Sequence, residues 1–112
     1  MTSKSLGKAL PFLKLVSNLS NQNRRRVLRE LGGDKTVYNA LNEIAHNTIK
    51  GKVKLNKSQS RKLKPHRKIL ENLCKPTNRN CSKKRKSLIV QSGGFLPILI
   101  PALATILSTI IK

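Results

Sequence analysis

Hydrophobic residues recur at helical spacing through most of this chain. Between residues 6 and 16 the apolar positions lie three or four residues apart, which predicts a first helix whose first turn could hold Pro11. Ser20 is a suitable N-cap for a second helix, and Gly32 and Gly33 would end that helix. The first third of the chain is therefore predicted to be helical.

The clearest helical pattern follows Asp34, which has the side chain of a good N-cap. Gly51 is a natural residue for the position just after the helix C-terminus. One face of this helix is apolar and should face the core. Its members are Val37, Leu41, Ile44, Ala45 and Thr48.

A further helical segment begins at Asn56, which forms a capping-box pattern with Gln59. Pro65 should kink or restart this helix, and Pro76 marks its end. The predicted inner face comprises Leu63, His66, Ile69, Leu70 and Leu73. We therefore expect an all-α fold. It would be a small three- or four-helix basic domain over residues 1–74, a basic linker over 75–94 and a C-terminal hydrophobic helix over 95–112.

The distribution of charge along the chain is the feature that most restricts the possible functions. The 112 residues carry 24 Lys and Arg against 4 Asp and Glu, for a net charge of +20. Every cation except Lys112 lies before residue 87, so a polycation precedes an uncharged apolar segment. So few carboxylates and histidines leave little for acid–base or metal chemistry, and we expect neither an enzyme nor a cofactor nor a metal site. This uneven distribution of charge indicates binding to nucleic acid, to an anionic membrane, or to one of these at each end of the chain.

The cations make double-stranded DNA the expected partner of the basic half. Tyr38 is the only aromatic residue there besides Phe12, and it belongs to the helix with the clearest buried face, so base stacking is not expected. We therefore expect non-specific contact with DNA phosphates. The basic run over residues 83–86 could instead be a nuclear import signal or a solvated linker. The candidate contacts are Arg24, Arg25, Arg26 and Arg29; Arg61, Lys62, Lys64, Arg67 and Lys68; and Lys83, Lys84, Arg85 and Lys86.

Cys74 and Cys81 do not make a disulfide framework. The expected state is two surface thiols in a reducing compartment. A disulfide, or a metal site that includes His66, is the alternative.

The C-terminal segment is apolar enough to suggest contact with membranes. As a helix, residues 95–111 would span about 25 Å, the short limit for a bilayer core. The alternative is that this segment packs on the helical domain as the missing part of its core. The candidate membrane residues are Phe95, Leu96, Ile98, Leu99, Ile100, Leu103, Ile106, Leu107, Ile110 and Ile111.

The junction before this segment, Gln91-Ser92-Gly93-Gly94-Phe95, resembles the sites cut by adenovirus-type maturation proteases. Gln91 would occupy the recognised position, and the Gly94–Phe95 bond would be cut. The order Lys-Lys-Arg-Lys, Gly-Gly-Phe-Leu-Pro and a hydrophobic C-terminus resembles adenovirus core protein X, the precursor of the mu peptide. It is closer still to the X-like proteins of Polinton/Maverick elements and adintoviruses, as is the segment over residues 37–51.

This resemblance implies a virion core protein that accompanies packaged double-stranded DNA. Its partners would be the DNA, the viral maturation protease and capsid proteins. The apolar composition of the C-terminal segment adds the expectation that this segment, once released, acts on membranes. The protein would reside in the virion, and in the host nucleus or cytoplasm before assembly. The alternatives are a tail-anchored membrane protein with a basic cytosolic domain, and a small lytic membrane protein.

Overall fold

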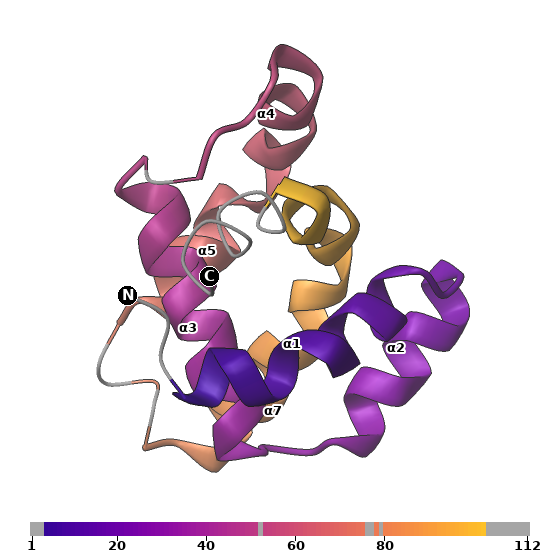
Figure 1. The fold of residues 1–112 in the computed structure, drawn as a ribbon. Coiled ribbons are helices and arrows are strands. Elements are labelled where there is room, and N and C mark those ends of the chain that lie inside the picture. The colour runs from indigo at the N-terminus through magenta and orange to yellow at the C-terminus, as the bar shows by residue number, and fades with distance from the viewer. Residues whose placement is uncertain (1–3, 52, 76–77, 79, 103–112) are drawn as a thin grey trace.

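The computed structural model describes residues 4–51, 53–75, 78 and 80–102. This described part is all-helical and contains no strand, which confirms the predicted fold class. Figure 1 shows the helices packed around a common centre. In chain order they are α1 (Lys4–Ser17), α2 (Asn21–Glu30), α3 (Lys35–Ile49), α4 (Lys57–Leu63), the short 3-10 helix η1 (Lys64–His66), α5 (Arg67–Leu73), α7 (Ser82–Gln91), the 3-10 helix η2 (Ser92–Gly94) and a helical turn over residues 96–102.

The predicted helix starts are confirmed by their hydrogen bonds. Ser20 Oγ accepts from the Asn23 N–H at 3.3 Å, and Asp34 Oδ1 accepts from the Val37 N–H at 2.9 Å. Asn56 and Gln59 form both halves of a capping box, at 2.7 and 3.0 Å. Local sequence therefore determines where α2, α3 and α4 begin.

Pro11 and Pro65 both lie within helical segments, and their consequences differ. Pro65 lies in η1 between α4 and α5, so the predicted kink or restart is confirmed. Pro11 lies inside α1 rather than in its first turn, because α1 begins at Lys4. Its ring is on the exposed side of the helix, where the loss of one backbone hydrogen bond is tolerated more easily.

Helix α3 is the centre of the core and packs against α1, α5 and α7. Its predicted apolar face is confirmed, because Leu41, Ile44 and Ala45 have no exposed surface. Tyr38 is also fully buried, with its hydroxyl oxygen 3.5 Å from the Leu73 carbonyl oxygen. This places the only tyrosine out of reach of a nucleic-acid base.

The expectation of a basic linker over residues 75–94 is wrong over residues 82–94, which form α7 and η2. Helix α7 buries Leu88 and Ile89 in the core. Arg85 Nε donates to the Gly33 carbonyl oxygen at 2.9 Å, which ties α7 to the turn between α2 and α3. The composition of this segment suggested a flexible linker. The two buried side chains and the hydrogen bond from Arg85 instead stabilise it as a helix packed on the domain.

The beginning of the C-terminal apolar segment belongs to the same core. Phe95, Leu96 and Leu99 are fully buried, and Ile100 is 4% exposed. They join side chains from α1, α2, α3, α5 and α7 in one hydrophobic cluster. Within the described part of the chain, no helix combines the length and the apolar character needed to cross a membrane. The other candidate membrane residues, Leu103, Ile106, Leu107, Ile110 and Ile111, lie outside the described residues.

Candidate anion-binding surface

Arg24 was predicted to contact DNA, but the structure gives it a different position. Only 9% of this residue is exposed. Its Nη1 donates to the Leu19 carbonyl oxygen at 2.8 Å and to that of Ser17 at 3.4 Å, and its Nη2 donates to Asn21 Oδ1. Arg24 therefore satisfies carbonyl groups at the C-terminal end of α1, where a cation also suits the helix dipole.

The other three arginines of α2 are exposed. Arg25, Arg26 and Arg29 are accessible to solvent, as the prediction requires. In the part of the chain that the structure describes, Arg25 and Arg29 have neither a hydrogen bond nor an ion pair through their side chains. Their positive charge is therefore available to an external anion.

A second group of exposed cations lies along α4, η1 and α5. Arg67 is 3.6 Å from Glu71, but both side chains are more than half exposed, so this ion pair adds little stability. All five predicted contacts in this group are accessible to a polyanion. They are Arg61, Lys62, Lys64, Arg67 and Lys68.

The third group forms the start of α7. Lys83, Lys84 and Lys86 are exposed, whereas Arg85 is half-buried by its contact with Gly33. No acidic residue occupies the first turn of α7. Cations at a helix N-terminus oppose the helix dipole, so this turn would be stabilised by a bound anion.

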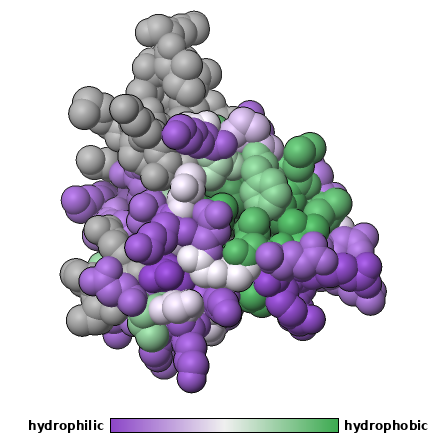
Figure 2. Space-filling view, turned by 90° about the horizontal axis from the view of Figure 1, so that it is seen from below, coloured by the Kyte–Doolittle hydropathy of each residue, from purple (hydrophilic) through white to green (hydrophobic). Residues whose placement is uncertain are grey.

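Figure 2 shows a face on which hydrophilic side chains border a continuous hydrophobic area that reaches the edge of the molecule. Two large apolar residues are exposed in the described part, Leu15 at 69% and Ile49 at 42%.

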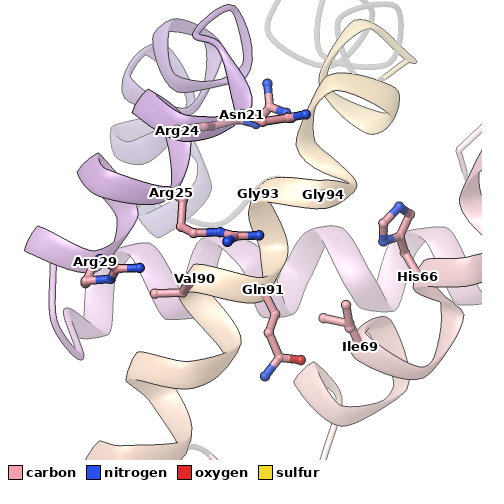
Figure 3. Close-up of a pocket in the computed structure, with 10 residues that line it drawn as sticks. All are labelled: Asn21, Arg24, Arg25, Arg29, His66, Ile69, Val90, Gln91, Gly93 and Gly94. Carbon is pink, nitrogen blue, oxygen red and sulfur yellow. The ribbon is translucent and has the colours of Figure 1, made fainter.

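A cavity with a volume of about 570 Å³ lies between α2 and the α7–η2 segment. Arg25 and Arg29 form one wall, and Ile69 and Val90 contribute apolar surface. His66 stands on the far side of Gly94 (Figure 3). No carboxylate of the described chain lines this cavity, so it carries a positive charge without a counterion on its wall.

The sequence did not indicate this cavity. His66 was expected on the inner face of a helix, but it is half-buried at the cavity rim. The arginines of α2 and His66 are brought together only when α5 and α7 pack against the rest of the domain. No local pattern in the sequence carries that information.

The predicted protease site forms the floor of the cavity. A Cβ on Gly93 would lie 3.0 Å from Leu28 Cδ1, and one on Gly94 would lie 2.6 Å from His66 Cε1. Ser92 Oγ donates to the Ile89 carbonyl oxygen at 2.6 Å, and Phe95 is fully buried. The Gly-Gly segment is thus held in a 3-10 turn rather than in the extended form that a protease groove requires.

Both cysteines are free thiols, with Cys81 exposed and Cys74 half-buried. Burial raises the pKa of the Cys74 thiol, and the nearby Glu71 carboxylate raises it further, whereas Lys50 opposes both effects. Among the described residues no group of three potential ligands could hold a metal ion. His66, the suggested third ligand, instead contacts Gly94.

Comparison with known proteins adds no assignment: no family model, no curated protein and no solved structure matches this chain. The resemblance to adenoviral core proteins therefore stays a prediction from the sequence motifs.

Proposed function

We propose that this protein binds double-stranded DNA through its phosphates, without sequence preference, and condenses it inside a virus or virus-like particle. The observation that carries the proposal is the exposure of cations on α2, on α4–α5 and at the start of α7, in a chain of net charge +20. Before assembly the protein would reside in the host nucleus or cytoplasm.

The size of the molecule fits this role. Its longest dimension is 33 Å. This corresponds to about ten base pairs, because each strand of B-DNA advances ~3.4 Å per phosphate. Such a stretch carries about twenty phosphates, which is close to the net charge of the protein.

The arrangement of the cations supports condensation rather than simple coating. Helix α4 lies at one end of the molecule, whereas α2 and α7 lie away from it (Figure 1). Cations that face different directions can neutralise phosphates of two duplexes at once. The buried position of Tyr38 removes a means of reading bases, which favours non-specific contact.

The proposal keeps a C-terminal segment that a viral maturation protease releases and that then contacts membranes, with capsid proteins as further partners. Because Phe95, Leu96 and Leu99 are buried, release requires the segment to leave the core after the bond is cut. Cleavage would therefore also weaken the helical domain. The tail-anchored alternative carries the same requirement, because these side chains cannot be in the core and in a bilayer together.

A titration of the full chain with duplex DNA tests the proposal. Affinity should be equal for random and fixed sequences, and log K should fall linearly with log salt concentration. Substitution of Lys83, Lys84 and Lys86 by Gln should reduce this slope by up to about three, because each neutralised phosphate accounts for ~0.9 of it.

Bridging can be measured separately, as energy transfer between donor- and acceptor-labelled duplexes mixed with the protein. Signal should appear at substoichiometric protein and disappear at high salt. A slope near zero, or strong preference for one sequence, would contradict the proposal. Tight binding without energy transfer would contradict condensation alone.

A further inference from the structure

We propose that the cavity between α2, His66 and the Gly93–Gly94 turn is a discrete site for a diphosphate group, such as that of a free nucleotide. This goes beyond duplex binding, because it assigns one pocket to a small ligand. Its volume of about 570 Å³ lies within the ~300–1,000 Å³ range of small-molecule sites.

The two arginines of the pocket are placed to share such a ligand. Arg25 and Arg29 are one helical turn apart, so their Cβ atoms are about 5–6 Å from each other. The Arg25 side chain points toward the η2 backbone, and Arg29 lies beside Val90 (Figure 3). One guanidinium group can donate two parallel hydrogen bonds to the oxygens of one phosphate. Two guanidinium groups can therefore hold two linked phosphates.

The charge of the pocket lacks an internal counterion. Within the described residues no Asp or Glu lines it, and neither Arg25 nor Arg29 makes an ion pair. Two like charges at this spacing repel each other and destabilise a helix slightly. The buried Arg24 guanidinium, which also lines the cavity, adds to the positive potential. A bound dianion would remove this repulsion.

The two glycines let neighbouring side chains pack closely against the turn that lines the pocket. Gly94 lets the His66 ring approach the backbone to a position that a Cβ would occupy. A ligand held by Arg25 would lie against one side of the Gly93–Gly94 turn, and the His66 ring packs on the other side of Gly94. Gln91 also lines the cavity, but its Nε2 donates to Ser87 Oγ at 2.7 Å, so the arginines are the main donors to a ligand.

The chain offers an internal control for a binding experiment, because it contains only two histidines. His66 lies at the pocket, whereas His46 is on α3 and does not line it. Pyrophosphate is titrated into the full chain at fixed pH and constant ionic strength, and the imidazole proton resonances are followed by NMR. The His66 resonance should shift and saturate, and the His46 resonance should stay in place.

Charge removal inside and outside the pocket separates a site from a general field. Arg25→Gln/Arg29→Gln should weaken pyrophosphate binding by about tenfold or more, as expected when charge-assisted hydrogen bonds are removed. Arg61→Gln/Lys62→Gln removes the same charge from α4 and should change the affinity less than about twofold at ~0.15 M salt. Circular dichroism checks that both variants remain folded.

Equal losses of pyrophosphate affinity in both variants would contradict the proposed site. Equal shifts of the His66 and His46 resonances would also contradict it. A short duplex without terminal phosphates provides the second arm. If it shifts His66 as strongly as pyrophosphate does, the pocket serves the DNA backbone and not a separate small ligand. Because the pyrophosphate titration contains no DNA, failure of DNA binding would not affect its outcome.

Discussion

Individual arginines on α2 have opposite roles although they are neighbours in the chain. Arg24 is directed back to the end of α1, where its guanidinium satisfies carbonyl groups that the helix leaves without partners. Arg25 and Arg26 project into solvent. The helical turn of about 100° per residue separates these directions. Position along the helix, and not residue type, decides which arginine stabilises the fold and which can bind an anion.

Arg24→Met should therefore lower the free energy of unfolding by about 1.5–3 kcal/mol, because it removes charge-assisted hydrogen bonds to partly buried carbonyl groups. Arg26→Met, at an exposed position, should change it by less than about 0.5 kcal/mol. Urea unfolding followed by circular dichroism measures both values. Equal stability of the two variants would show that the Arg24 hydrogen bonds contribute nothing.

The two thiols should differ in reactivity with iodoacetamide. Cys81 is exposed, whereas Cys74 is half-buried and its pKa is raised by burial and by Glu71. Near neutral pH, Cys81 should be alkylated first, and Cys74 should follow only as the pH rises above the usual thiol pKa of 9.0. Mass spectrometry of digested samples quantifies each site. Faster alkylation of Cys74 at neutral pH would contradict its position.

The raised pKa also affects stability. The unfolded chain releases the Cys74 proton at lower pH than the folded chain does. The contribution of the protonated thiol is therefore complete below pH 9 and is lost as the pH rises through the folded-state pKa. Cys74→Ala should remove this part of the alkaline loss of stability.

Among the helical elements, the segment after Gln91 belongs to the domain core. Phe95 and Leu99 have no exposed surface, and η2 connects them directly to α7. The preceding helices alone would leave an incomplete core, because such a small domain has few apolar residues to bury. The linker prediction over residues 82–94 and the independent-tail prediction over residues 95–102 are therefore wrong for the same reason, which is burial of apolar side chains in the core.

Leu99→Ala tests this assignment. Loss of a fully buried leucine should lower the free energy of unfolding by about 2–5 kcal/mol, through reduced burial and the cavity that remains. Ile98→Ala, at a partly buried neighbouring position, should cost less. Thermal unfolding of the full chain in the absence of lipid gives the comparison. An unchanged melting temperature for Leu99→Ala would restore the independent tail.

For the whole molecule, the balance between a small core and a large positive charge determines stability. Mutual repulsion of a net charge of +20 opposes the compact state. The exposed Arg67–Glu71 pair does little to relieve it. The folded protein should therefore be sensitive to ions that screen or bind its surface.

Raising sodium chloride from ~0.01 M to ~0.15 M should increase the melting temperature, because the screening length falls from about 30 Å to about 8 Å. At constant ionic strength, duplex DNA should raise it further by binding the folded state. Differential scanning calorimetry measures both effects. A melting temperature that falls with salt would mean that attraction, and not repulsion, dominates the surface charges.

The amino-acid sequence alone was enough to predict the helical class, the N-caps at Ser20, Asp34 and Asn56, and the buried face of α3. These features depend on side chains three or four residues apart, so local spacing carries the information. Burial of Arg24, the contact of His66 with Gly94, and the packing of Phe95 became evident only in the folded molecule. Each of these features joins surfaces from different helices. Burial of apolar area between those helices stabilises the folded segment, although its local composition predicted a linker and a separate tail.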